Sequence, residues 1–274
     1  MSSLSSLAPP AAAKEPSLKI AFVLLPRPQL PAMSDVARAF ATFAPKGESL
    51  HPGNAVGQEA ASPDATMTLD LGANGTAYVS LMPVPVPKGE ADEAARYSLS
   101  SMGTGWKLPA HQAHLIVALS DESGGRKLDV LTRFTALLAA VTQSSAAVGI
   151  YWGDAGATHD PKFFLEIARE PESGARLMVW TGVSLAHEKD GRLSLLSLGM
   201  QQLGLPDLLL VGPKEDASGT LAALFDFLEM SVQEGKPIPE GDTVGRSAEE
   251  RLRVHYVPSP IDASKKVWRV ELPR

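Results

Sequence analysis

The chain has 274 residues, of which 44% are hydrophobic and 20% charged, a balance typical of a globular protein with a large core rather than of a disordered chain. Its net charge is −6 at pH 7 and its basic residues form no long cluster, which argues against the basic face that nucleic-acid binding requires. It contains no cysteine, which excludes disulfides, thiolate catalysis and thiolate metal sites.

The first 17 residues are rich in serine, alanine and proline and predict a disordered tail. They lack the basic start and long apolar core of a secretory signal, and the chain has no apolar run of the roughly 18 residues that a membrane span needs. We therefore expect a cytoplasmic protein without membrane contact. The remainder, 18–274, is expected to form one globular domain or two subunits, 18–120 and 121–274.

In the first half of the chain, short apolar runs bounded by turn residues predict buried strands. They cover Leu18–Leu25, Thr66–Leu71, Tyr78–Met82 and His114–Leu119, and Asn74-Gly75 predicts a hairpin turn. A helix is expected after Ser34 or Asp35, where Val36, Phe40 and Phe43 have helical spacing, and another over Glu90–Leu99. The polar segment Lys46–Pro63 is expected to be a loop.

In the second half, two long segments have apolar residues at helical spacing and predict amphipathic helices that pack on a sheet, Leu128–Gln143 and Gly219–Glu234. A shorter helix should start at Pro161, with Asp160 as its cap. The expected strands are Val148–Trp152, Leu177–Leu185, Leu193–Leu198, Leu208–Val211, Leu252–Val257 and Lys266–Leu272. Lys189-Asp190-Gly191 predicts a hairpin turn between the second and third of these strands.

Strands and helices interleave, but the two hairpins interrupt their alternation. This order favours an α/β fold with mixed sheets and packed helices over a doubly wound parallel sheet. The order of elements fits two fused ferredoxin-like βαββαβ units that share the middle of the chain.

Three segments resemble a known protein family: Tyr151–His159 (YWGDAGATH), Leu198–Asp207 (LGMQQLGLPD) and Pro239–Gly245 (PEGDTVG). Together they are similar to the bacterial domain-of-unknown-function family 4261, over roughly Leu18 to Val257 and most strongly from His111 onward. The family pattern leads us to expect an acid such as Glu where this chain has Asp207. The resemblance implies a bacterial protein without an established activity, and it assigns no catalytic residue.

Two glycine-containing loops, 121–127 and 153–160, each follow a predicted strand and precede a helix. The free N–H groups of a helix N-terminus can hold a phosphate or carboxylate, although Asp154 would repel an anion and the Lys-Ser/Thr of a P-loop is missing. If the two strands are parallel and adjacent, the loops share one rim of the sheet. Arg126, Trp152, Asp154 and His159 would then form a binding cluster. The alternative is that Trp152 is buried and the loops serve only as turns.

Other chemistry finds little support in the sequence. His111, His114 and His159 have no spacing diagnostic of a metal site, so we expect neither a metal nor another cofactor. Gly182-Val-Ser184-Leu-Ala186 is a degenerate nucleophile elbow, and a charged turn follows it where a hydrolase needs a helix. No catalytic residue is therefore predicted.

Two functions remain open. The first is a non-catalytic interaction protein, of the adaptor or immunity type, that sequesters a partner protein, and the acidic chain would suit a basic partner. The second is a small-molecule or anion-binding protein, or a hydrolase, that uses the glycine loops at 121–127 and 153–160.

Overall fold

The computed structural model describes residues 17–53 and 66–273. The tail predicted at the N-terminus lies outside the described residues except for Ser17, which begins the first strand. Much of the loop predicted at Lys46–Pro63 also lies outside them.

Seven strands form the larger sheet, in the spatial order β2-β3-β4-β5-β1-β6-β7. Every neighbouring pair is antiparallel. The strands are β1 Ser17–Leu25, β2 His51–Pro52, β3 Thr66–Asp70, β4 Gly75–Met82, β5 Ala113–Asp121, β6 Gly149–Trp152 and β7 Ala157–His159. The predicted hairpin at Asn74-Gly75 is confirmed, because β3 and β4 pair on either side of it.

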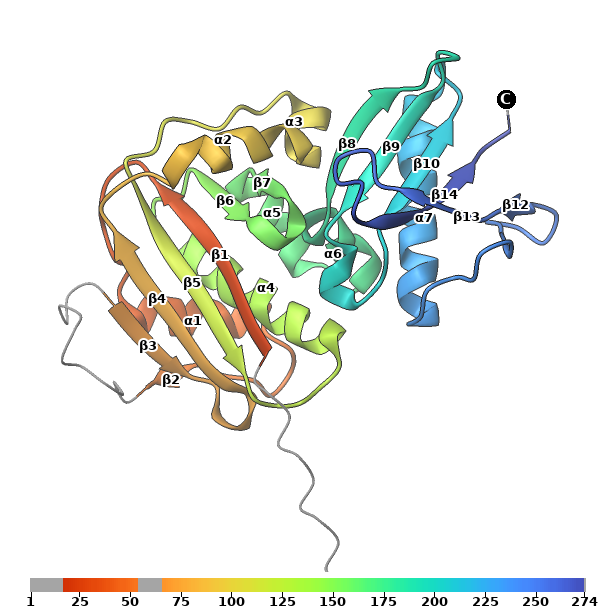
Figure 1. Cartoon of the computed structure of the whole chain (residues 1–274). Coiled ribbons are helices and arrows are strands. Elements are labelled where there is room, and N and C mark those ends of the chain that lie inside the picture. The colour runs from red at the N-terminus through yellow and green to blue at the C-terminus, as the bar shows by residue number, and fades with distance from the viewer. Residues whose placement is uncertain (1–16, 54–65, 274) are drawn as a thin grey trace, which may run out of the picture.

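Two helices, α1 (Met33–Phe43) and α4 (Lys127–Gln143), cover one face of this sheet and lie behind its strands in Figure 1. The alternation of side chains along β1 explains the division between the two faces. Ala21, Val23 and Leu25 join the core cluster that includes α4, whereas Leu18 and Ile20 on the other face are exposed. Of the two faces of this sheet, only the one under α1 and α4 is packed into the main core.

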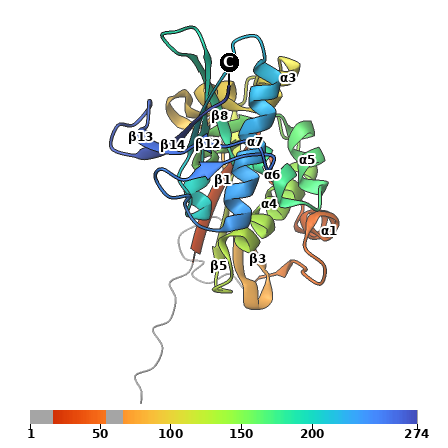
Figure 2. The ribbon, with the colours of Figure 1, turned by 90° about the vertical axis from the view of Figure 1, so that its right-hand side faces the viewer.

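The smaller sheet has five strands in the order β13-β14-β10-β9-β8. They are β8 Gly182–His187, β9 Leu193–Leu198, β10 Leu208–Gly212, β13 His255–Pro258 and β14 Lys266–Glu271. The strands β10 and β14 are parallel neighbours, and the helix α7 (Ala217–Glu234), which follows β10 in the chain, packs against β9 and β10. Figure 2 shows that α7 and the helices of the larger sheet lie toward one side of the molecule.

Shorter elements fill the space around and between the two sheets. The helices are α2 Glu90–Ala94, α3 Leu99–Thr104, α5 Pro161–Arg169 and α6 Ser173–Trp180. The 3-10 turns are η1 Gly72–Asn74, η2 Pro87–Gly89, η3 Ala95–Tyr97, η4 Gly153–Ala155 and η5 Met200–Leu203. A two-stranded ladder of β11 (Thr243–Val244) and β12 (Leu252–Arg253) completes the described part of the chain.

The predicted α/β class with mixed sheets and packed helices is confirmed, and both long helices lie within two residues of their predicted bounds. Without the outer strands β2, β3 and β7 and the short helices α2 and α3, the larger sheet has the chain order β1-α1-β4-β5-α4-β6, and the spatial order of these strands is β4-β5-β1-β6. The smaller sheet is built differently, since β8, β9 and β10 are spatial neighbours in chain order. The prediction of two fused ferredoxin-like units is therefore not confirmed.

The strand predicted at Leu177–Leu185 is wrong in its first half, because α6 extends to Trp180 and β8 starts only at Gly182. A short apolar run fits a helix and a strand equally well, so packing decides between them. Here the indole Nε1 of Trp180 donates a hydrogen bond of 2.7 Å to Thr135 Oγ1 on α4, which fixes the helix in the core.

A buried ion-pair cluster holds α4 against the end of β5. Arg133 on α4 donates hydrogen bonds to Asp121 and, through Nε and Nη2, to both carboxylate oxygens of Glu48 at 2.8 and 2.9 Å. A buried charge is stable only when it is paired. Here the Arg133 guanidinium has two carboxylate partners, and the three residues come from three different segments. The cluster therefore joins the sheet, the helix and the segment that follows α1.

Candidate functional site

The two glycine-containing loops emerge at the same end of the larger sheet. Because β5 and β6 are both antiparallel to β1, they run parallel to each other. They are not adjacent, however, since β1 lies between them. Lys19 of β1 occupies the intervening position, with its Nζ 3.9 Å from Asp154 Oδ2.

Arg126 lies at the surface, where its guanidinium forms a two-point hydrogen bond with Asp129 one turn further along α4, at 2.8 and 3.0 Å. These hydrogen bonds lower the pKa of the Asp129 carboxyl and raise the pKa of Arg126. The arginine is thus exposed but already paired, and its role in binding stays a prediction.

Trp152 is fully buried and packs edge-on against Phe134 of α4, with 5.1 Å between the ring centroids. Its indole Nε1 has no hydrogen-bond partner among the described residues. A core position leaves no indole surface for a partner, so Trp152 is a packing residue, as the alternative interpretation of the sequence held.

His159 is also fully buried, and its two ring nitrogens lie 2.8 Å from Ser98 Oγ and 3.1 Å from the Val179 carbonyl oxygen. Because a carbonyl can only accept, the neutral ring carries its proton on Nε2 and Nδ1 accepts from the Ser98 hydroxyl. Burial lowers the pKa of His159 to about 4, so the ring is neutral at pH 7. Ser98 is buried as well, so this serine–histidine pair holds the fold together and is closed to a substrate.

The four predicted binding residues therefore do not form one surface cluster. Arg126 and Asp154 reach the surface, whereas Trp152 and His159 lie in the core. His159 is buried because the short strand β7 turns back along β6, although the sequence indicated only a loop there. Trp152 is buried because its side chain on β6 packs against Phe134 of α4.

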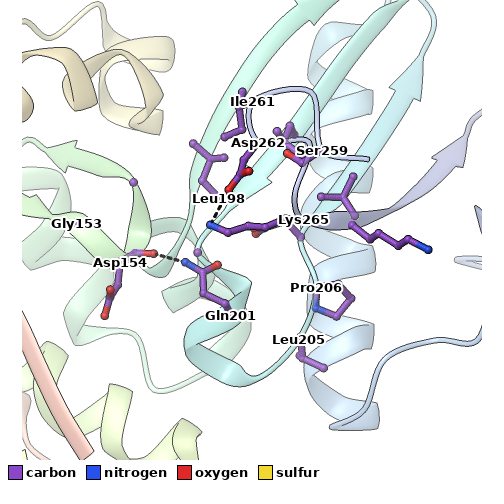
Figure 3. A pocket seen from close by; sticks show the side chains of 16 residues that line it. Gly153, Asp154, Leu198, Gln201, Leu205, Pro206, Ser259, Ile261, Asp262 and Lys265 are labelled. Carbon is purple, nitrogen blue, oxygen red and sulfur yellow. Dashed lines mark hydrogen bonds and ion pairs between the residues drawn. The ribbon is translucent and has the colours of Figure 1, made fainter. Parts of the chain in front are cut away.

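Asp154 instead borders a cavity of about 420 Å³ between the two sheets. Figure 3 shows this cavity, with Asp154 on one side and residues of the smaller sheet and of the loop 259–265 on the other. The lining comes from η4 and the residue after it, from the end of β9 through η5 to Asp207, and from the loop before β14 and the first two residues of that strand: Gly153, Asp154, Gly156, Leu196, Leu198, Gly199, Gln201, Leu205, Pro206, Asp207, Ser259, Ile261, Asp262, Lys265, Lys266 and Val267.

Two glycines let the opposite walls of the cavity approach each other. A Cβ at Gly199 would lie 2.7 Å from the Trp180 carbonyl oxygen and 2.9 Å from that of Asp154, and a Cβ at Gly156 would lie 3.1 Å from Leu198 Cβ. Both glycines also have positive φ angles, +117° and +65°. The segments 151–159 and 198–207 thus pack closely against each other, and Gln201 Nε2 donates to the Asp154 carbonyl at 3.2 Å.

Asp207 is the most buried carboxyl group of the cavity lining. Its Oδ1 accepts hydrogen bonds from Ser197 Oγ at 3.1 Å and from the Met200 N–H at 3.0 Å. Burial raises the pKa of Asp207, and these donors oppose the shift because they stabilise the ionised form. The sequence marked this position only through the family resemblance, because the donors gather around it only in three dimensions.

A second candidate surface is the uncovered face of the larger sheet, which we call the open face and define by Leu18, Ile20, Tyr78, Ile116 and Ala118. Ile20, Ala118 and Tyr78 are register partners across β1, β5 and β4. Leu18 is 58% exposed, and Ile20 and Tyr78 are each 39% exposed. At the other end of the same face, α2 packs over the strands through the cluster of Leu24, Val86 and Ala91.

Within residues 17–53 and 66–273, no three histidine, aspartate or glutamate side chains gather closely enough to hold a metal ion. None of the helices in that part of the chain is long and apolar enough to cross a membrane.

Residues 196–271 match the model of a family described as a domain of unknown function, DUF4261. The match covers less than half of the chain, and it confirms the resemblance to this family for the segments 198–207 and 239–245, which lie inside it. Most residues that line the cavity lie within the matched range 196–271, while Gly153, Asp154 and Gly156 lie outside this range. No curated protein and no solved structure matches the chain.

Proposed function

We propose that this chain is a non-catalytic interaction protein that binds a partner protein on the open face of its larger sheet. The observation that carries the proposal is the unequal cover of that sheet. Helices α1 and α4 bury one face, whereas Leu18, Ile20 and Tyr78 remain exposed on the other. Contiguous exposed apolar side chains on a soluble protein are typical of an interaction surface.

The charges around the open face indicate the kind of partner. One row of register partners crosses four strands from β1 to β3 and consists of Leu18, Ser120, Thr76 and Asp70. The exposed carboxylate of Asp70 therefore lies at the edge of the apolar surface. Glu122, also exposed, follows the end of β5 at the same side. With a net charge of −6 on the whole chain, the matching partner is a protein whose apolar patch has a basic rim. By binding this partner, the present chain would act as a cytoplasmic adaptor or immunity-type protein that sequesters it.

The burial of the serine–histidine pair formed by Ser98 and His159 also favours binding over hydrolysis at this position. Ser98 and His159 are both fully buried. The serine of the degenerate elbow, Ser184, lies within β8 and pairs with Leu196 of β9, whereas a nucleophile elbow needs a strand-to-helix turn.

The proposal is tested in two steps. The wild-type chain is first used to capture and identify a partner, and the purified partner is then titrated against three forms of the protein. Ile20→Asp places a charge among the exposed apolar side chains of the open face and should weaken binding at least tenfold, which corresponds to about 1.4 kcal/mol. Ile261→Asp makes the same change at another exposed isoleucine, 59% accessible on the loop before β14, and should leave affinity unchanged.

Equal affinities of wild type and Ile20→Asp, at equal melting temperatures, would contradict the proposal. Light scattering of the purified chain is the second readout. A wild-type dimer that Ile20→Asp converts to a monomer would assign the open face to a second copy of the chain and would also overturn it.

A further inference from the structure

The cavity between the sheets unites two of the three segments that resemble the family. Gly153, Asp154 and Gly156 come from the segment 151–159, and Leu198 through Asp207 come from the segment 198–207. These segments are separated by about forty positions in the chain, and the positive φ of Gly156 and Gly199 permits their close packing. This construction is independent of the open face.

The size and lining of the cavity fit a small organic molecule. Its volume of about 420 Å³ lies in the range of sites for small ligands. The apolar part of the lining comes from Leu196, Leu198, Leu205, Ile261 and Val267, and three of these side chains are almost fully buried. An apolar group entering the cavity would therefore replace water against a surface that is already formed.

The charges of the lining favour a cationic ligand. Three carboxylates border the cavity, and two of them form an ion pair with a lysine: Asp262 Oδ2 lies 3.4 Å from Lys265 Nζ, and Asp154 Oδ2 lies 3.9 Å from Lys19 Nζ. Lys265 also lies near enough to Asp207 to oppose the rise that burial causes in the pKa of that carboxyl. Asp207 forms no ion pair with any residue in the described part of the chain. Lys266, the other lysine of the lining, lies near enough to Glu240 to lower the pKa of that carboxyl.

We propose that this cavity binds a small organic cation, a primary amine or guanidinium group on an apolar body, with the Asp207 carboxylate as its counter-ion. Ser197 and Met200 fix the carboxylate by donating hydrogen bonds to Oδ1, so it is oriented before a ligand arrives. The apolar walls take up the body of the ligand. Gln201, which Figure 3 shows beside Asp154 at the cavity, donates a hydrogen bond to the Asp154 carbonyl.

Lys265 regulates access to the cavity. Figure 3 shows its side chain extended across the cavity toward Asp262, and 72% of this side chain is exposed. Its positive charge opposes the entry of a cation, so a ligand displaces it into solvent. Because burial raises the pKa of Asp207, affinity for a cation should fall as the pH drops through that pKa and the carboxylate becomes neutral.

Calorimetric titration with three probes of one shape tests the proposal: benzylamine, benzyl alcohol and benzoate. The wild-type chain should bind benzylamine, and should bind the neutral alcohol and the anion at least tenfold more weakly. Asp207→Asn keeps an acceptor for Ser197 and Met200 but removes the charge, so it should lose at least tenfold in affinity for benzylamine. It should also lose the pH dependence of binding.

Two control variants complete the experiment. Asp242→Asn makes the same substitution at an exposed aspartate outside the cavity and should bind benzylamine as the wild type does. Lys265→Ala changes a largely exposed side chain and should bind benzylamine more tightly than the wild type, which tests the charge balance even if Asp207→Asn folds poorly.

Three outcomes would overturn the proposal. Benzoate could bind more tightly than benzylamine, Lys265→Ala could weaken benzylamine binding, or the wild type could bind none of the probes at millimolar concentration. All three leave the docking test on the open face unaffected, since Ile20 does not line the cavity.

Discussion

His159 shows that a histidine, a residue type common in catalytic and metal sites, can serve only to stabilise the fold. Its ring is fully buried, and both nitrogens have partners, the Ser98 hydroxyl and the Val179 carbonyl. The sequence could not distinguish this histidine from a surface ligand, because Ser98 and Val179 are 61 and 20 positions away in the chain. Trp152 was misleading for the same reason, since its partner Phe134 lies on another element.

We expect His159 to destabilise the protein at mildly acidic pH. Its pKa is lowered from 6.5 to about 4 in the folded state, so between these values the unfolded chain binds a proton that the folded protein does not. Stability is therefore complete above pH 6.5 and falls as the pH drops toward 4, by about 3 kcal/mol. Urea unfolding of wild type and His159→Gln from pH 4 to 7 measures this, since glutamine keeps a donor and an acceptor without titrating. A difference between the two proteins that is constant with pH would contradict the assignment.

At the scale of elements, the long amphipathic segments were predictable and the short ones were not. Helices α4 and α7 extend over 17 and 18 residues, and this length lets a helical pattern stand out. Strand β7 has three residues and α6 only eight, so tertiary contacts determine their form. The shared rim predicted for the loops 121–127 and 153–160 required β5 and β6 to be parallel and adjacent. The two strands are parallel, but β1 lies between them, and this order could not be foreseen from local pattern.

The close packing at Gly199 can be tested by substitution. Gly199→Ala adds a Cβ that meets two backbone carbonyl oxygens at 2.7 and 2.9 Å, at a φ of +117°. It should cost about 3 kcal/mol or more of unfolding free energy, because backbone cannot move aside easily. Gly235→Ala is the matched control: its φ is +66° and nothing lies within 4 Å of the added Cβ. It should cost about 1 kcal/mol, and equal losses in the two variants would show that the close approach at Gly199 is not tight.

At the scale of the whole molecule, the two sheets share one core. A single cluster of buried apolar residues runs from Ala21 in β1 to Leu272 beyond β14 and includes both α4 and α7. The larger sheet contains residues up to His159, so a boundary at 120 would separate β6 and β7 from their neighbour β1. The smaller sheet starts at Gly182.

We therefore expect one cooperative unfolding transition for the entire described part of the chain. Differential scanning calorimetry should give a single peak whose calorimetric and van't Hoff enthalpies agree. Two resolved peaks would instead support independent subunits.

The position of β1 also has a consequence for the newly made chain. This strand is the first in the sequence, yet its neighbours β5 and β6 start at residues 113 and 149. At synthesis rates of about 5–20 residues per second, several seconds pass between the synthesis of β1 and the synthesis of β5, the first of its two neighbours. During that time the apolar run LKIAFVLL has no partner of its own, so the nascent chain should depend on a chaperone that shields extended apolar segments.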